Sequence, residues 1–387
     1  MNITKLIALI LSLCLSLCLL AGCGEAAETD AGETDTEQAA ESREDGDDAG
    51  SAEDAAEEDA EPVASIDYDA AQKAFDPDQV VAKVDGKDIL WTEVYYWLHY
   101  IISYDEYFSG GQIDWDEGAG EGMSLEDYYK DYAVKGTVYY TVVTEKAEEN
   151  GVSVTAEQEQ QIQNSIDSYA EQYGGQEGFE HELAASYMTL DLYKYFSEVA
   201  CLHENLSAKL FGENGEKLSA EQVQAFIDEQ GFYGAKHILI NADETDPDGA
   251  RAKAQEVLDK LNAGEDFDKL MNEYSEDPGL MTNPDGYVAM RGSMVPEFED
   301  AALALEPGQH SDLVESSFGY HIIMRTDIDE NSIPMEYADE GMSLRALAAD
   351  DAFSKQLDEW LEAADLQLMP EFEKLKLSEI FVLKDAE

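Results

Sequence analysis

Apolar residues recur with helical spacing through most of the chain between residues 92 and 230. Just before this region, two short alternating stretches flank Asp85-Gly86, a pair that favours a hairpin turn over residues 80–90. Apolar spacing, capping residues and terminal glycines then predict a succession of helices. We expect them from Thr92, from Ser124 to about Asn150, from Thr155 towards Tyr173, over 177–187, over 189–211 and over 220–230.

The pattern changes at Lys236, where a short apolar strand over 236–240 is expected. Helical spacing follows over 248–262 and 266–274, and Gly264 separates the two stretches. A strand over 286–290, a short helix over 296–305 and one or two strands within 313–326 complete a compact α/β or α+β region. Residues 343–366 are again amphipathic, and we expect them to dock on the earlier helices.

The amino terminus has one positive residue, Lys5, and then an apolar run too short to span a membrane. This run ends in Leu20-Ala21-Gly22-Cys23, which resembles the bacterial lipobox. The resemblance implies cleavage before Cys23 and a diacylglyceryl anchor on its sulfur, and two acyl chains hold a protein stably at a membrane. An ordinary signal peptide that happens to contain cysteine is the alternative interpretation.

A strongly acidic stretch follows this motif and predicts a tether before the folded part of the chain. Residues 24–62 hold 17 acidic residues and one basic residue, with no aromatic side chain, so we expect them to be disordered and extended. The whole chain has 23 Lys and Arg against 87 Asp and Glu, a net charge of −64 that excludes nucleic acid as a partner. A hydrophobic content of 44% excludes a wholly disordered acidic protein.

Five short stretches after residue 234 carry the chemistry. They are Ala235-Lys236-His237-Ile238-Leu239-Ile240, Gly264-Glu265-Asp266-Phe267, Tyr274-Ser275-Glu276-Asp277, Arg291-Gly292-Ser293-Met294-Val295-Pro296-Glu297-Phe298-Glu299 and Phe318-Gly319-Tyr320-His321-Ile322-Ile323. In this order they resemble the parvulin peptidyl-prolyl isomerase domain. With the lipobox and the helical flanks, the whole chain resembles the PrsA-type foldase lipoproteins, with flanks of SurA-like chaperone character.

The resemblance implies an α+β fold, a mostly helical chaperone domain with an inserted parvulin-like βα2βαβ domain. The implied division is a lipoprotein signal peptide (1–22), an acidic disordered tether (23–75), the first part of the helical chaperone domain (76–232), the isomerase domain (233–328) and a C-terminal helical part that packs on the chaperone domain (329–387). No cofactor and no metal is expected, because rotation about a peptide bond makes and breaks no covalent bond.

The resemblance also assigns the site. Met294 and Phe298 would form the floor of an apolar cup for the proline ring, which their i and i+4 spacing allows. His237 and His321 would lie on neighbouring strands behind the site, with Asp277 beside the rotating carbonyl. All five also have ordinary interpretations, as core residues or, for Asp277 before Pro278-Gly279, as a turn residue.

Two further positions are less defined. The chain lacks the Asp-Leu-Gly stretch that precedes Arg-Gly in many parvulins, so the third wall of the cup falls to Val288 or Met290. Ser316 or Ser317 stands where the family has Thr or Ser before the second histidine. We assign Val288 and Ser317 to substrate binding. Because Glu276 adjoins Asp277, a shift of one residue would exchange their roles.

The function implied is a membrane-anchored, extracytoplasmic isomerase and chaperone for secreted proteins with X-Pro bonds. The acidic stretch 241–248, where phosphate-directed parvulins are basic, predicts that phosphorylated substrates are repelled. A holdase without useful catalysis is the alternative, since surplus aromatic residues of the first helices could line a cradle for unfolded chains. A solute-binding lipoprotein is disfavoured because repeated strand–helix alternation is absent. Homodimer formation stays open.

Overall fold

The computed structural model describes residues 65–384 except 110–112, 116, 121 and 243–244. The signal peptide, Cys23 and the tether as far as residue 64 therefore lie outside the described residues. The chain divides into two compact units. Unit 1 holds the described residues up to Leu202 together with those from Trp360 onward, and unit 2 is His203–Glu359. Both boundaries fall inside helices, α7 (Leu190–Phe211) and α12 (Leu344–Ala363).

Unit 1 is mainly helical, and its helices begin where the capping residues predict. Ser124 accepts a hydrogen bond from the Asp127 amide at 3.1 Å, and Thr155 forms a capping box with Gln158. The elements before α7 are α2 (Tyr68–Gln72), β1 (Val80–Val84), β2 (Lys87–Leu90), α3 (Trp91–Phe108), β3 (Gly118–Gly120), β4 (Met123–Ser124), α4 (Leu125–Glu149), α5 (Ala156–Gln172) and α6 (Gln176–Ala185).

The end of the chain completes unit 1. Strand β9 (Leu366–Leu368) pairs antiparallel with β1, so the sheet order is β2-β1-β9. Helices α13 (Pro370–Glu373) and α14 (Leu377–Ile380) follow. Phe381 stacks on Tyr95 with ring centroids 6.0 Å apart, and Trp91 meets Phe372 edge-on at 6.3 Å. Most of the aromatic residues of α3 and α4 are buried in this core.

One boundary of the expected tether is wrong. Ile66 is buried, and residues 68–72 form helix α2, capped by Asp67. Tyr68 donates a hydrogen bond to Glu106 at 2.8 Å, which ties the segment to α3. The described structure is therefore folded before residue 75, because Ile66 and Tyr68 supply large apolar side chains, which residues 24–62 lack. No helix among the described residues is long and apolar enough to cross a membrane.

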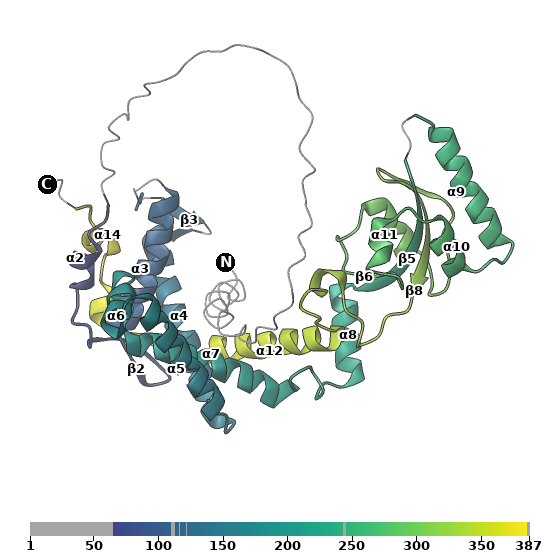
Figure 1. Ribbon diagram of the computed structural model, residues 1–387. Helices are drawn as coiled ribbons and strands as arrows, with labels where there is room; N and C mark the ends of the chain where they lie inside the picture. The colour runs from purple at the N-terminus through teal and green to yellow at the C-terminus, as the bar shows by residue number, and fades with distance from the viewer. Residues whose placement is uncertain (1–64, 110–112, 116, 121, 243–244, 385–387) are drawn as a thin grey trace, which may run out of the picture. The chain divides into compact units, whose positions relative to one another are not determined.

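Unit 2 contains a four-stranded antiparallel sheet in the order β6-β5-β8-β7. Figure 1 shows β5 and β8 between α11 on one side and the pair α9 and α10 on the other. The elements are α8 (Ala220–Gln230), β5 (Tyr233–Asn241), α9 (Pro247–Asn262), α10 (Phe267–Tyr274), the 3-10 helix η2 (Pro278–Met281), β6 (Tyr287–Ala289), α11 (Pro296–Leu303), β7 (Val314–Ser316), β8 (Gly319–Thr326) and the 3-10 helix η3 (Met335–Tyr337). The α+β class is confirmed, with two strands at the end of the expected βα2βαβ order.

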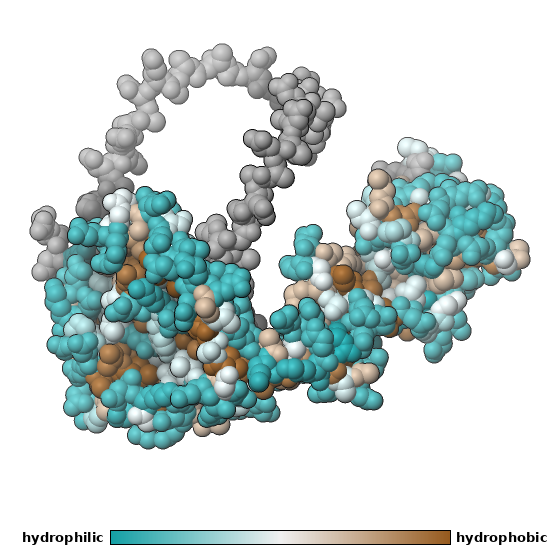
Figure 2. Space-filling view, turned by 60° about the horizontal axis from the view of Figure 1, so that its bottom comes forward, coloured by the Kyte–Doolittle hydropathy of each residue, from teal (hydrophilic) through white to brown (hydrophobic). Residues whose placement is uncertain are grey.

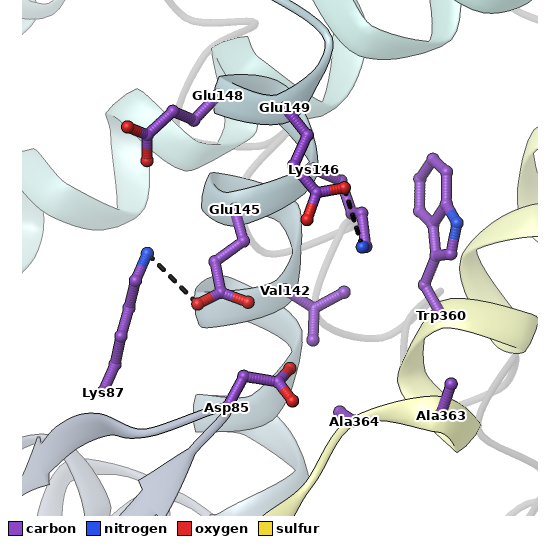
Figure 3. A pocket seen from close by; sticks show the side chains of 10 residues that line it. All are labelled: Asp85, Lys87, Val142, Glu145, Lys146, Glu148, Glu149, Trp360, Ala363 and Ala364. Carbon is purple, nitrogen blue, oxygen red and sulfur yellow. Dashed lines mark hydrogen bonds and ion pairs between the residues drawn. The ribbon is translucent and has the colours of Figure 1, made fainter.

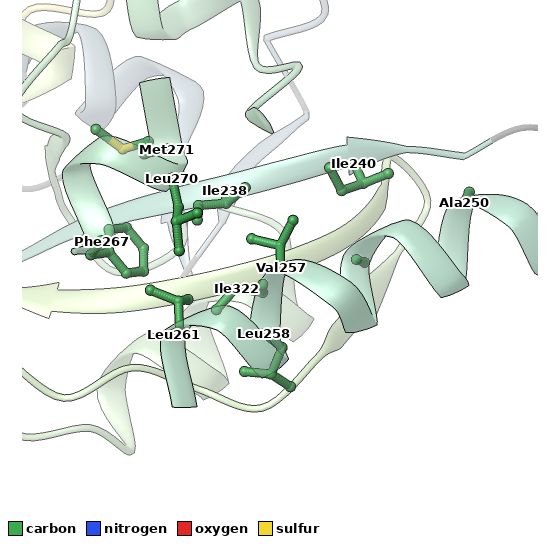
Figure 4. Close-up of a cluster of buried hydrophobic side chains, with 11 residues drawn as sticks. Ile238, Ile240, Ala250, Val257, Leu258, Leu261, Phe267, Leu270, Met271 and Ile322 are labelled. Carbon is green, nitrogen blue, oxygen red and sulfur yellow. The ribbon is translucent and has the colours of Figure 1, made fainter. Parts of the chain in front are cut away.

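Alternation along the two central strands divides unit 2 into two faces. Ile238 and Ile240 of β5, with Ile322 of β8, point towards α9 and α10 and form the core shown in Figure 4. The residues between them point towards α11 instead, and there Ile323 packs with Phe298. His237 and His321 are directly adjacent to the core residues Ile238 and Ile322 along their strands, so their side chains point to the opposite, α11 face.

Candidate active site

His237 and His321 meet on the α11 face of the sheet. In the antiparallel register His237 pairs with Ile323 and Leu239 with His321, so the two histidines are diagonal neighbours on one face. Their Nδ1 atoms lie 3.0 Å apart, and the rings are nearly parallel with centroids 5.3 Å apart. His321 is only 3% exposed, so its ring belongs to the interior of the domain.

The segment after α10 delivers Asp277 to His237. The Leu239 amide donates to Ser275 Oγ at 3.2 Å and the Glu276 amide donates to the Leu239 carbonyl at 2.8 Å, which fix this segment along β5. Asp277 then caps η2, and its Oδ2 lies 2.8 Å from Nε2 of His237. The neighbouring Glu276 binds the Asn241 amide and Lys253 instead, so Asp277 is the carboxylate that the fold brings to the histidines.

A continuous chain of hydrogen bonds results. An ionised Asp277 only accepts, so His237 Nε2–H must donate to it. With both rings neutral, His321 Nδ1–H then donates to His237 Nδ1, and Ser316 Oγ–H donates to His321 Nε2 at 2.7 Å. For two neutral rings the contacts admit only this arrangement, in which the carboxylate sets the tautomer of both imidazoles.

Electrostatics favours the ionised carboxylate and a neutral inner histidine. The hydrogen bond from His237, with those from Tyr287 and the Gly279 amide, holds the pKa of Asp277 well below its usual range although partial burial opposes this. Burial lowers the pKa of His321 to about 4, and the neighbouring His237 acts in the same direction. Asp277 keeps 14% of its side chain exposed, so a bound peptide can reach it.

The lowered pKa of His321 makes the stability of unit 2 depend on pH. An unfolded histidine takes up a proton near its ordinary pKa of about 6.5, whereas the folded His321 does so only near 4. Below pH 6.5 the unfolded state therefore binds more protons, and unit 2 should lose stability steadily as the pH falls from 6.5 to 4. NMR titration of the His321 ring should show a neutral imidazole at pH 5, with a histidine peptide as reference. A midpoint near 6.5 would contradict the buried network.

The expected cup residues lie beside the histidines. Phe298 of α11 is 2% exposed, and its ring stands edge-on to His237 at 5.2 Å and to His321 at 5.8 Å. Met294 is half-buried and packs against the same cluster. The structure thus brings together five of the residues expected in the site, the two histidines, Asp277, Met294 and Phe298.

Two expected positions need correction. Val288 packs against the cluster that contains α8 and the start of α12, because Tyr287 and Val288 point to opposite faces of β6. It is therefore not a wall of the cup. Ser316, rather than Ser317, binds His321, since Ser316 pairs with Gly319 at the end of β7. Tyr287, which the sequence analysis did not select, donates to Asp277 Oδ2 at 2.6 Å.

Unit 1 contains a cavity of about 630 Å³ between the β1–β2 turn, α4 and the end of α12 (Figure 3). Its two lysines are paired with glutamates, Lys87 with Glu145 at 3.3 Å and Lys146 with Glu149 at 2.9 Å. Lys146 also lies 5.9 Å from the centre of the Trp360 ring. Because glutamates balance the charge of both lysines, we place the candidate active site at the histidine pair of unit 2 rather than in this cavity.

Comparison with known proteins agrees with this location. Residues 237–327 match the family model described as "Rotamase: PPIC-type PPIASE domain". The foldase protein PrsA of Halalkalibacterium halodurans is 43% identical over 119 residues, which are 29% of this chain and 33% of that protein. The PrsA of Oceanobacillus iheyensis is 30% identical over 213 residues, 54% of this chain and 66% of that protein.

A crystal structure of PrsA from Bacillus subtilis shares 23% sequence identity, covering 65% of this chain and 92% of that one. Its TM-score of 0.24 supports no comparison of how the parts are arranged. The chain spans about a third of the length of the Halalkalibacterium halodurans protein, and 31–35% of the length of three further PrsA proteins. The match is thus firmest over the domain that carries the histidine pair.

Proposed function

Since residues 237–327 are a PPIC-type, or parvulin-type, peptidyl-prolyl isomerase domain in a relative of the PrsA foldases, we propose that the protein catalyses cis–trans isomerisation of X-Pro bonds in secreted proteins. The observation that carries the proposal is the hydrogen-bonded chain from Ser316 through both histidines to Asp277, next to Phe298. The site would thus offer an apolar ring, Phe298, for the proline and an anion, Asp277, beside the preceding carbonyl.

The chemistry suits this arrangement. Twisting a peptide bond breaks its resonance and costs about 18–20 kcal/mol, so catalysis requires tighter binding of the twisted form than of either planar form. Phe298 and Met294 would hold the proline ring while the preceding carbonyl turns past Asp277. The histidines would hold the carboxylate in place, and no proton or electron pair need move.

The proposed partners are unfolded or partly folded clients outside the cytoplasm. Support for this place comes from the Leu20-Ala21-Gly22-Cys23 motif, through which a lipid on Cys23 would anchor the protein to the membrane. The acidic residues 24–62 would then act as the spacer between membrane and folded units. Clients without phosphate are the expected substrates, because residues 241–248 carry four acidic side chains and no basic one.

The test is isomerisation of an X-Pro peptide by the protein without its first 22 residues, measured with and without a phosphate on the residue before proline. We expect catalysis of the plain peptide and at least several-fold slower turnover of the phosphorylated one, because the site and its surroundings are acidic. An inactive protein would contradict the proposed catalysis. Faster turnover of the phosphorylated peptide would contradict the proposed substrate class.

The second candidate is a holdase that grips unfolded chains without useful catalysis. It is favoured by three aromatic residues at the end of α3, since Tyr104, Tyr107 and Phe108 are 54%, 80% and 67% exposed. Figure 2 shows hydrophobic patches on unit 1 within an otherwise hydrophilic surface. Suppression of aggregation by a protein that is inactive towards the X-Pro peptide would favour this function over the isomerase.

A further inference from the structure

The Asp277 carboxylate has a second side-chain partner that the expected site did not include. Tyr287 Oη donates to Oδ2 at 2.6 Å, and His237 Nε2 donates to the same oxygen at 2.8 Å. The other oxygen, Oδ1, accepts from the Gly279 amide at 3.0 Å. Two donors on one oxygen and one on the other fix both the position and the rotation of the carboxylate.

The placement of Tyr287 is set by strand β6. Tyr287 pairs with Ala235, two residues before His237, so its side chain leaves the sheet on the same face as the histidines. Gly286 makes this possible, because it has a φ of +96° and a Cβ there would lie 2.7 Å from the Ala235 carbonyl oxygen. The phenol ring stands edge-on to His237 with centroids 5.9 Å apart.

The turn that holds Asp277 also rests on Tyr287. A Cβ at Gly279 would lie 2.0 Å from Tyr287 Oη, so the backbone of η2 passes directly over the hydroxyl. The hydroxyl therefore has room only where the residue at 279 lacks a side chain. Tyr287, Gly279 and Asp277 form one interlocked group, held from β6 on one side and from η2 on the other.

We infer that Tyr287 is a positioning residue of the isomerase site, whose hydroxyl fixes the Asp277 carboxylate against His237. The inference rests on the proposed isomerase function and adds to it a residue that acts through Asp277. Because Asp277 orders the protons of both histidines, loss of the Tyr287 hydroxyl weakens the alignment of the whole hydrogen-bonded chain. The effect falls on turnover, since the apolar cup of Phe298 and Met294 stays intact.

The first experiment compares Tyr287→Phe with the parent protein in the X-Pro peptide assay. We expect kcat to fall about tenfold with KM nearly unchanged, the size of effect that one charged hydrogen bond can supply. The variant should also lose activity at a higher pH on acidification, because the carboxylate has lost a donor that favours its ionised form. Tyr320→Phe is the matched control, since Tyr320 lies on the α9 and α10 face of β8.

The second experiment separates this inference from the proposed function. NMR titration of the Asp277 carboxyl carbon requires no turnover, and its midpoint should rise in Tyr287→Phe but stay unchanged in Tyr320→Phe. Gly279→Ala should displace the hydroxyl and raise the midpoint as well, and adding it to Tyr287→Phe should cause little further change. An unchanged midpoint, or an active Tyr287→Phe with the parent kcat and pH profile, would overturn the inference. An inactive parent with the expected midpoint shift would overturn only the isomerase function.

Discussion

Asp277→Ala should lower kcat/KM for an X-Pro peptide by about 100-fold while the domain stays folded. The substitution leaves His237 Nε2–H and the Tyr287 hydroxyl without their acceptor, and a lost hydrogen bond to a charged group is worth about 1.5–3 kcal/mol. It also removes the anion that sets the tautomer of both histidines. The assay of cis–trans exchange with a plain X-Pro peptide measures this loss directly, and circular dichroism verifies the fold.

Glu276→Ala provides the matched control, because the adjacent carboxylate binds Lys253 and the Asn241 amide away from the histidines. We expect this variant to keep activity within about twofold of the parent. Equal losses in both variants would show that the segment, rather than the Asp277 carboxylate, matters. Full activity of Asp277→Ala would remove the carboxylate from the mechanism.

Phe298→Ala should destabilise unit 2 by about 3–5 kcal/mol and abolish measurable isomerisation. Phe298 is 2% exposed and packs with Tyr233, Ala302 and Ile323, so truncation leaves a cavity between α11 and the sheet. The two histidine rings also lose their edge-on neighbour. Urea unfolding followed by the NMR signals of His237 and His321 reports the stability of this unit.

Phe318→Ala is the control for the stability measurement, since this phenylalanine is 59% exposed in the β7–β8 turn and should change stability by less than about 1 kcal/mol. Phe298→Leu should recover most of the stability but little of the activity, because leucine fills volume without the flat ring surface. A stable and fully active Phe298→Ala would show that the proline cup lies elsewhere.

The sequence predicted the parts of this site that obey simple periodicity. The strands that carry His237 and His321 could be predicted from their apolar residues, whereas the resemblance to the parvulin domain placed the two histidines in one site. Helix starts were equally accessible, since the Thr155 and Ser219 capping boxes depend on residues three positions apart. Met294 and Phe298 were predicted from the resemblance to the parvulin domain, which their i, i+4 spacing allows, and the structure places both in one cluster.

Other features depend on contacts that the sequence does not encode locally. Choosing between Val288 and Tyr287 requires the register of β6 against β5, and a shift of one residue would exchange their faces. The choice between Ser316 and Ser317 depends in the same way on the end of β7. Strand β9 is three exposed residues, and only its distant partner β1 makes it a strand.

The pairing of β1 with β9 constrains the order in which the protein folds. Ala82 pairs with Leu368 and Ile66 pairs with Leu383, so these strand contacts of unit 1 join segments near opposite ends of the described chain. Unit 2, in contrast, is contiguous from His203 to Glu359. In a chain that emerges amino terminus first, the isomerase domain can therefore fold while β1 still presents an open edge. The helical unit is then completed last, when β9 pairs with β1. Because unit 2 has already folded, the flexible part of the chain between β1 and β9 is shorter, and its closure costs less entropy.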